Sequence, residues 1–220
     1  MQNKSLLALA SILTFCEKHF GNEVNKILGE VKSRNVFEQL IITIISQNTN
    51  WKNTWKAYIN LKKAFGGISP EKILSTSEEA LRSMLKPAGL YRAKSKVIKN
   101  VAKVFLEQRL HETLDSEKLR EMLIKIPGIG PKTVDVVLAF SFNEPIIPVD
   151  THIRRIAKRI GLVSSSNYEE IKECLEKNIP AKYRLKAHFQ LISFGRKICK
   201  ARKPLCSECP ANTFCPSKTT

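Results

Sequence analysis

The chain has 220 residues, 43% of them hydrophobic, which is enough for one large domain or two small ones with an ordinary core. Lysine and arginine total 37 against 20 acidic residues, so the formal net charge is +17. A positive excess of this size attracts a polyanion over long range, so nucleic acid is the first expected partner, and a basic protein without such a ligand is the alternative. No stretch reaches the roughly 18 uninterrupted apolar residues of a membrane-spanning helix, so we expect no membrane partner.

The first apolar run, Leu6–Leu13, resembles the core of a signal peptide, but its surroundings argue against export. Only Lys4 precedes it as a basic residue, and Phe15 and Cys16 do not form a small-residue cleavage site. The apolar side chains instead recur at helical spacing, at Leu6, Leu9, Leu13 and Phe20. We therefore predict an amphipathic first helix and an intracellular protein, in the cytoplasm or nucleoid.

Helical periodicity recurs along almost the whole chain, and the alternation typical of strands is nearly absent. Asn35 and Asn50 are the expected N-caps of the second and third helices, and Gly66-Gly67 ends the third. Further helices are predicted to begin at Ser77 and to span residues 91–108, 116–124, 131–142, 151–160, 168–178 and 181–199. The prediction is an all-α chain of about ten helices, with a domain junction at a Pro-containing connector over residues 143–148.

The stretch Ile126–Thr133 combines a sharp turn, a helix start and a primary amine. Gly128 and Gly130 are expected to allow positive φ and close backbone approach, and Pro131 suits the first position of a helix. The first N–H groups of that helix have no partner within it, so they form an anion site suited to a phosphate. Lys132 stands in the first turn beside this site.

A primary amine is a nucleophile only after losing its proton, and the positive end of a helix disfavours the ammonium form. Lys132 is therefore a candidate Schiff-base residue; the alternatives are a phosphate contact or an ion pair with Asp135. Asp150 begins the next helix, where it can serve as N-cap. A helix over residues 131–142 is about 18 Å long at ~1.5 Å per residue, and segment 143–150 reaches roughly 26 Å at ~3.3 Å per residue. The two side chains can therefore share a cleft, where a carboxylate stabilises cationic sugar character and assists proton transfer.

Four cysteines near the end of the chain have six, two and five residues between them: Cys199, Cys206, Cys209 and Cys215. We call Cys199–Cys215 the cysteine loop. Four thiols in so short a segment converge on one centre, and disulfides are disfavoured without an export signal. A four-cysteine zinc site usually presents two close pairs, whereas one close pair with wider gaps suits a larger cubane. The spacing therefore favours an iron–sulfur cluster and leaves zinc as the alternative.

Three cations, Lys200, Arg202 and Lys203, fill the first gap of the cysteine loop. A metal that orders the loop also fixes these cations, so we predict that they bind phosphates; a solvated group of charges is the alternative. The two remaining cysteines, Cys16 and Cys174, lie among apolar helix positions and are predicted to be buried core thiols.

Together, the sequence Ile126-Pro-Gly-Ile-Gly-Pro-Lys132-Thr, the segment Val149-Asp150-Thr-His152 and the cysteine spacing resemble the endonuclease III branch of the helix-hairpin-helix DNA glycosylases. The resemblance covers nearly the whole chain. It implies a six-helix barrel over residues 28–143 that ends in the helix-hairpin-helix. It also implies a discontinuous [4Fe–4S] domain over residues 1–27 and 144–220, with the site in a cleft between the two domains.

The resemblance further implies a monomeric base excision repair enzyme that acts on duplex DNA with a damaged base or an abasic site. Lys132 corresponds to the amine that displaces the base at C1′ and forms a Schiff base, from which β-elimination cuts the strand. Asp150 corresponds to the assisting carboxylate. Gln47 and Leu90 occupy the positions of residues inserted into the vacated space; their ordinary interpretations are a helix-terminal polar residue and a core leucine. His152 matches a position near the lesion and would otherwise be interpreted as a surface histidine.

A lysine at position 132 favours lyase activity, because adenine and G·T mismatch glycosylases of this group usually carry another residue there. Asn50 stands where many members have an aspartate, which leaves the base preference open. The leading hypothesis is a glycosylase and lyase for oxidised pyrimidines. The alternatives are a glycosylase for uracil or thymine opposite guanine, and a non-catalytic module that binds DNA phosphates. Trp51, Trp55 and Tyr58 share one helical face and are predicted to be core residues rather than a base-stacking platform.

Overall fold

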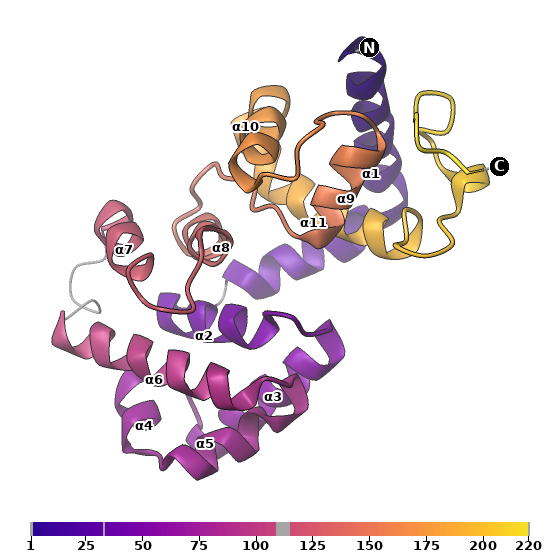
Figure 1. The fold of residues 1–220 in the computed structure, drawn as a ribbon. Helices are drawn as coiled ribbons and strands as arrows, with labels where there is room; N and C mark the ends of the chain where they lie inside the picture. Colours follow the sequence, from indigo (N-terminus) through magenta and orange to yellow (C-terminus); the bar gives the residue numbers. More distant parts are fainter. Residues whose placement is uncertain (1, 33, 109–114, 220) are drawn as a thin grey trace. The chain divides into compact units, whose positions relative to one another are not determined.

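The structure, a computed structural model, describes residues 2–32, 34–108 and 115–219. In this part of the chain the regular elements are all helical, so the predicted all-α class is confirmed (Figure 1). The α-helices are α1 (Gln2–Lys32), α2 (Val36–Ser46), α3 (Trp51–Phe65), α4 (Pro70–Ser75), α5 (Glu78–Leu85), α6 (Tyr91–Glu107), α7 (Ser116–Leu123), α8 (Pro131–Ser141), α9 (Thr151–Arg159), α10 (Tyr168–Asn178) and α11 (Arg184–Lys197). Short 3-10 turns are η1 (Lys86–Ala88), η2 (Ala181–Tyr183) and η3 (Cys206–Glu208). Within the described ranges, no helix has the length and apolar character needed to cross a membrane.

Side chains that precede the apolar stretches begin several of these helices. Asn35 accepts a hydrogen bond from the N–H of Glu38 at 2.8 Å, and Asn50 accepts one from the N–H of Asn53 at 2.9 Å. Gly66, at φ 67°, ends α3 in the left-handed region that favours glycine. Both predicted caps and the predicted end of the third helix are therefore confirmed.

Three elements differ from the sequence-based expectation. α1 continues to residue 32, beyond Phe20, the last apolar position of its sequence pattern, because Val24 and Val31 extend its buried face and a glycine inside a helix costs only about 1 kcal/mol. α4 is too short to show periodicity, although Ser69 caps it and Pro70 occupies its first turn. α11 begins at Arg184 rather than at residue 181, because residues 181–183 form the tighter turn η2.

The chain divides into two compact units. One comprises Arg34–Phe142 and contains α2 to α8; we call it the hairpin unit. The other combines Met1–Ser33 with Asn143–Thr220 and contains α1 and α9 to α11; we call it the cysteine unit. The boundary expected after residue 27 falls inside α1, and the boundary expected after residue 143 lies one residue beyond the observed junction.

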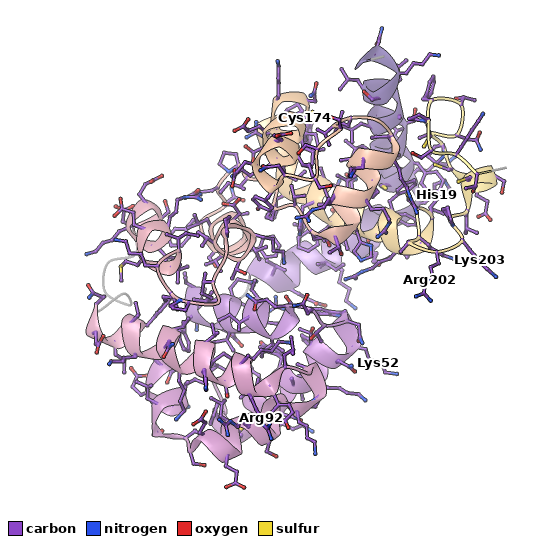
Figure 2. All side chains as sticks on the ribbon, viewed as in Figure 1. His19, Lys52, Arg92, Cys174, Arg202 and Lys203 are labelled. Atoms are coloured by element: carbon purple, nitrogen blue, oxygen red, sulfur yellow. The ribbon has the colours of Figure 1, made fainter. Side chains whose placement is uncertain are left out.

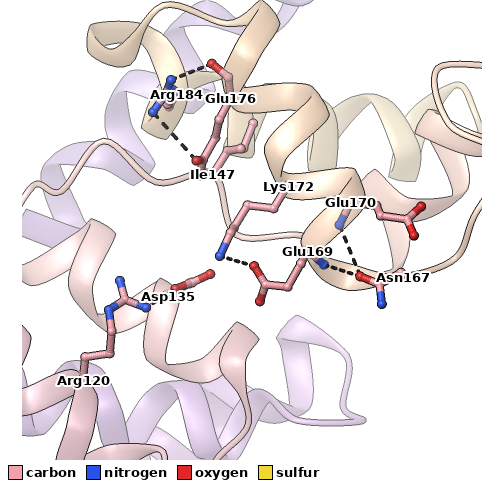
Figure 3. Close-up of polar contacts among 9 residues, drawn as sticks. All are labelled: Arg120, Asp135, Ile147, Asn167, Glu169, Glu170, Lys172, Glu176 and Arg184. Atoms are coloured by element: carbon pink, nitrogen blue, oxygen red, sulfur yellow. Dashed lines mark hydrogen bonds and ion pairs between the residues drawn. The ribbon is translucent and has the colours of Figure 1, made fainter.

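α2 forms the centre of the hairpin unit. Its side chains are buried from Phe37 to Ile45, as expected for a helix that is apolar on nearly all sides, and it packs against α3, α6 and α8. An ion pair joins α7 to α8, because Arg120 contacts the carboxylate of Asp135 at 2.9 Å and the Asp135 side chain is only 1% exposed (Figure 3). A buried carboxylate needs this partner, so the pair fixes the two helices on either side of the turn between them.

The core of the cysteine unit consists of apolar residues from α1, α9, α10 and α11, and α11 packs against both α1 and α9. At the contact of α11 with α9, a Cβ on Gly195 would lie 2.8 Å from the Cβ of His152, so only glycine allows this approach. On α10, Asn167 caps the first turn and Lys172 pairs with Glu169 (Figure 3). This close approach places the backbone of α11 directly against His152.

Candidate functional site

The hairpin, residues 124–130, links α7 to α8. Its backbone closes on itself, since the N–H of Ile129 donates to the carbonyl of Ile126 at 3.0 Å and both isoleucines are buried. Gly128 has φ 93°, and a Cβ there would lie 2.5 Å from Cγ2 of Val97 on α6. The predicted requirement for glycine is therefore confirmed at Gly128, for reasons of both conformation and space.

Gly130 has a different role. It is the N-cap of α8 with φ −104° and ψ 172°, an extended conformation that other residues also adopt, so the expectation of positive φ is wrong here. A Cβ at Gly130 would meet no atom within 4 Å. The glycine thus leaves open space beside the first N–H groups of α8, which is what an approaching phosphate requires.

Lys132 follows Pro131 in the first turn of α8, and its side chain is half-buried. Asp135, the ion-pair partner considered from the sequence, contacts Arg120 of α7. The next residue, Thr133, is buried. The hairpin therefore places a primary amine at the positive end of an eleven-residue helix, beside an open stretch of backbone.

Gln47 and Leu90 both belong to the hairpin unit but have different surroundings. Gln47 is the C-cap of α2, and its Nε2 donates to the carbonyl of Gly128 at 3.2 Å and to the hydroxyl of Thr133 at 3.1 Å. Its side chain is thus attached to the hairpin. Leu90 is 60% exposed and has φ 47°, so the interpretation as a core leucine is wrong. A leucine held at the surface in a strained conformation offers its apolar side chain to a ligand.

Lys94 on α6 connects the loop after α2 to the turn before α6, and the sequence-based prediction does not include it. Its side chain is buried, and its Nζ donates to the carbonyl of Ile45 at 2.8 Å, the hydroxyl of Thr49 at 2.7 Å and the carbonyl of Ala88 at 2.9 Å. These three acceptors satisfy the three donors of an ammonium group. Burial lowers the pKa of Lys94 to about 8. The sequence contains one signal that could have revealed this buried lysine: Lys94 lies four positions before Ile98, on the core face of α6.

The aromatic residues of α3 are only partly in the core. Tyr58 is 5% exposed, which confirms its prediction, whereas Trp51 and Trp55 are 47% and 38% exposed. The core prediction is therefore wrong for the two tryptophans. Thr54 is fully buried, and one helical step of about 100° turns Trp55 away from it. Helical spacing places these three side chains on one side of α3, but that side lies at the edge of the buried face of the helix.

Asp150 and His152 lie at the start of α9 in the cysteine unit. Oδ1 of Asp150 accepts hydrogen bonds from the N–H groups of His152 and Ile153, both at 2.9 Å, so its role as N-cap is confirmed. Both bonds end at Oδ1, so the cap does not use Oδ2. His152 is half-buried, and burial lowers the pKa of its imidazole; Asp150 opposes this shift, and Arg155 and Arg196 add to it. The imidazole is therefore biased toward its neutral form.

The cysteine loop brings four thiols and a guanidinium to one pocket, which is lined by Cys199, Cys206, Cys209, Cys215 and Arg159. Arg159 donates to Sγ of Cys199 at 3.4 Å, and the thiol of Cys215 donates to the Arg159 carbonyl at 3.2 Å. Burial raises the pKa of the Cys209 and Cys215 thiols. Within the described ranges, no three His, Cys, Asp or Glu side chains are grouped closely enough to hold a metal ion.

The three cations of the cysteine loop, Lys200, Arg202 and Lys203, are exposed, and Figure 2 shows Arg202 and Lys203 extending away from the ribbon. Arg159 attaches this segment to α9, because it donates to the carbonyl of Lys200 at 2.6 Å and to that of Ala201 at 3.1 Å. The sequence-based prediction attributes the order of this segment to a metal alone. The structure adds an arginine that positions its backbone.

The two cysteines outside the cysteine loop have different environments. Cys16 is fully buried, as predicted, and burial raises its pKa to about 12. Cys174 is only partly buried, and its Sγ lies 3.7 Å from the carbonyl of Leu162. The prediction of a core thiol is therefore confirmed for Cys16 and wrong for Cys174, which lies in the middle of α10 but is only partly buried.

Comparison with known proteins gives a consistent set of similarities. Residues 41–181 match the HhH-GPD superfamily of base excision DNA repair proteins. Endonuclease III of Sulfolobus acidocaldarius is 40% identical over 185 residues, which cover 84% of this chain and 83% of that protein. A solved structure of a trapped covalent intermediate of endonuclease III with DNA matches with a TM-score of 0.77 at 28% identity, covering 93% of this chain and 94% of that one. A thermostable thymine-DNA glycosylase shares the fold, with a TM-score of 0.79 at 22% identity, covering 98% of this chain and 96% of that one.

Proposed function

Because the chain belongs to the endonuclease III family of the HhH-GPD base excision DNA repair proteins, we propose that it removes oxidised pyrimidines and uses Lys132 as its nucleophile. The chain is a DNA glycosylase and abasic-site lyase, and duplex DNA is its partner. The observation that carries the proposal is the place of Lys132 in the first turn of α8, two positions after the open backbone at Gly130. A phosphate held by that backbone brings a sugar next to the amine.

In the proposed reaction the unprotonated Nζ of Lys132 forms a bond to C1′ of the damaged nucleotide. The bond from C1′ to the base breaks, and the base leaves with a proton. The sugar opens to a Schiff base; loss of a proton from C2′ then expels the 3′ phosphate, which cuts the strand. Asp150 assists proton transfer during base loss through Oδ2, the oxygen that its cap leaves unused.

Borohydride reduction in the presence of duplex DNA with an abasic site tests the role of Lys132. The wild-type protein is expected to form a covalent adduct that Lys132→Gln does not form, because a reduced Schiff base is permanent. Lys125→Gln is the matched control, since Lys125 is an exposed lysine of the same hairpin. A folded wild-type protein that gives no adduct would contradict the proposal.

The role of Asp150 calls for a variant that keeps the cap. Asp150→Asn retains an oxygen that accepts the two hydrogen bonds of the first turn of α9 and removes only the charge. We expect slower base release at unchanged thermal stability. An unchanged rate of base release would restrict Asp150 to capping.

The preferred lesion is decided by a base-release panel. Duplexes containing an oxidised pyrimidine, uracil opposite guanine, or thymine opposite guanine are compared under single-turnover conditions. Oxidised pyrimidines are expected to react fastest. The likeness to a thymine-DNA glycosylase concerns the fold alone, so a preference for mismatched uracil or thymine would replace the proposed substrate.

The proposal assigns Leu90 and Gln47 to the space that the extruded nucleotide vacates. Two observations support it: the side chain of Leu90 is exposed, and Lys94 holds the carbonyls of Ile45 and Ala88, which lie two positions before Gln47 and Leu90 respectively. Gln47 must exchange its hydrogen bond to Gly128 for one to DNA. Leu90→Ala is expected to slow base release more than it weakens binding of abasic DNA, because an abasic site needs less insertion energy.

The four cysteines of the cysteine loop hold a [4Fe–4S] cluster in this proposal. The donor set consists of thiols alone, which such clusters use, and all four line one pocket. Arg159 adds a hydrogen bond to the sulfur of Cys199, as outer residues do around metal ligands. When bound, the cluster cross-links the four thiolates and so stabilises the loop. Iron and acid-labile sulfide are expected in the purified protein; stoichiometric zinc without iron would contradict the assignment.

The remaining DNA contacts proposed for the cysteine unit are His152, Lys200, Arg202 and Lys203. The three cations of the cysteine loop are exposed, and their backbone is attached to α9 through Arg159. A fixed cation loses less conformational entropy on binding a phosphate than a mobile one does. The neutral imidazole of His152 contributes a hydrogen bond rather than a charge.

A further inference from the structure

The outer edge of α3 combines two exposed indoles with two exposed lysines. The ring centroids of Trp51 and Trp55 are 5.5 Å apart with their planes tilted by 33°. Lys52 lies three positions before Trp55 and four before Lys56, so these side chains are neighbours on the helix surface. Figure 2 shows Lys52 extending away from the ribbon. An edge of this composition is aromatic on one side and positively charged on the other.

The aromatic stripe changes character along α3. At its inner end the ring of Tyr58 lies 5.2 Å from that of Trp55 and is buried, and the Tyr58 hydroxyl donates to Glu38, which also pairs with Lys62 at 2.9 Å. At its outer end, the helix sequence supplies no acid to match Lys52, because α3 contains four lysines and no aspartate or glutamate. The outer edge is therefore complementary to a polyanion with flat apolar surfaces.

The same edge lies close to the hairpin along the chain. Gln47 contacts the Gly128 carbonyl at 3.2 Å, and Trp51 lies four positions after Gln47 in sequence. Four extended residues span at most about 14 Å, so Trp51 lies within that distance of the backbone of Gln47. Trp51 and the hairpin thus both lie near Gln47, so one DNA molecule can contact both.

We propose that the Trp51–Trp55 edge binds an unpaired base of the DNA, with the indoles stacked on the base and Lys52 and Lys56 on the flanking phosphates. Stacking on a side chain requires a base whose face is uncovered, which a single strand or a locally opened duplex provides and an intact duplex does not. A glycosylase creates such bases when it extrudes a nucleotide. The choice of DNA as the ligand rests on the proposed function.

Trp51 and Trp55 are the two tryptophans of the chain, so tryptophan emission reports on this edge alone. The protein is titrated with oligothymidine, an intact duplex and a duplex with one abasic site, while the anisotropy of labelled DNA measures binding independently. Oligothymidine and the abasic duplex are expected to quench the emission strongly, and the intact duplex much less. Unchanged emission when oligothymidine is bound would overturn the proposal.

Substitutions then separate stacking from charge. Trp51→Leu and Trp55→Leu are each expected to weaken binding of oligothymidine roughly 5- to 150-fold. Trp55→Phe, which keeps an aromatic ring, is expected to retain most of the wild-type affinity. Lys52→Gln is compared with Lys63→Gln, which removes the same charge from another exposed position of α3. The Lys52 change is expected to weaken binding more. Wild-type affinity in both leucine variants, or equal effects of the two lysine changes, would contradict the proposal.

Two further outcomes are informative. Self-association of the protein that shifts its emission in the absence of DNA would assign this edge to a protein contact and overturn the proposal. Base release is measured on the same preparations. A protein whose emission is quenched but that releases no base supports this inference and contradicts the proposed function, and the opposite result contradicts this inference alone.

Discussion

The hairpin and the cysteine loop both present groups suited to DNA phosphates, but they are stabilised in different ways. The hairpin depends on its own backbone: Gly128 is left-handed and packs against Val97, and buried isoleucines close the turn. The cysteine loop depends on side chains that reach it from elsewhere, namely Arg159 and four thiols around one pocket. A turn fixed by backbone geometry keeps its shape without a ligand, whereas a loop fixed by side chains and, as proposed, by a cluster requires both.

Removal of one thiol should break the cysteine loop and leave the hairpin intact. Cys209→Ser leaves three thiolates for a cluster that needs four, so we expect loss of iron, proteolytic cleavage near residues 200–203 and weaker DNA binding. Cys174→Ser is the matched control, because Cys174 is a partly buried cysteine outside the loop. Iron content and limited proteolysis measure the effect. Full iron content in Cys209→Ser would show that this thiol is not a ligand.

The converse change should break the hairpin. Gly128→Ala places a methyl group 2.5 Å from Val97 in a conformation that alanine rarely adopts, so we expect the free energy of unfolding to fall by about 2–4 kcal/mol. Gly130→Ala is the control, since its conformation is extended and its surroundings are open. Urea denaturation should show almost no loss for Gly130→Ala, whereas DNA affinity should fall because the methyl group narrows the approach to the backbone. Equal stability losses would refute the distinction between the two glycines.

The parts of the molecule that could be predicted from the sequence are those that depend on neighbouring residues. The caps at Asn35 and Asn50, the glycine turn and the helix that carries Lys132 are each specified within a few positions, so their physical causes are visible in the chain. The all-α class follows from the same local signals. The spacing of the cysteines likewise indicates that they gather at one pocket, because short segments limit how far thiols can separate.

The parts that could not be predicted depend on hydrogen bonds to backbone carbonyls, which no residue type marks in the sequence. Lys94 donates to the carbonyl of Ile45, which is 49 positions away, and Arg159 donates to the carbonyl of Lys200, 41 positions away. Every residue has a carbonyl, so no sequence pattern marks these partners. The exposure of Trp51 is similar, because helical spacing defines a face but not how far the core extends across it.

Lys94 shows the same dependence on distant partners inside the hairpin unit, where its amine joins Ile45, Thr49 and Ala88. The pKa of Lys94 is about 8 in the folded chain and has its ordinary value of 10.5 in the unfolded chain. Between these two pH values the unfolded chain therefore binds a proton that the folded chain lacks. Stability from this group therefore rises with pH across that window, by up to about 1.4 kcal/mol per pH unit. Denaturation of the wild type and Lys94→Met from pH 7 to 10 measures it, as a difference that increases with pH. A constant difference would show that the ammonium group is not buried in solution.

The smallest expected effects test whether the cations of the cysteine loop act one by one. Replacing Lys200, Arg202 or Lys203 singly by glutamine should reduce the slope of log affinity against log salt by about 0.9, if each binds one phosphate. Lys177→Gln, which removes an exposed charge from α10, is the control and should leave the slope unchanged. The three reductions should also disappear in the Cys209→Ser background, because a loop released from its cluster no longer fixes its cations. Equal reductions of the slope in both backgrounds would mean that the cations bind phosphates even when the cysteine loop is not ordered. The contrast between the cysteine loop and the hairpin would then concern structure but not DNA binding.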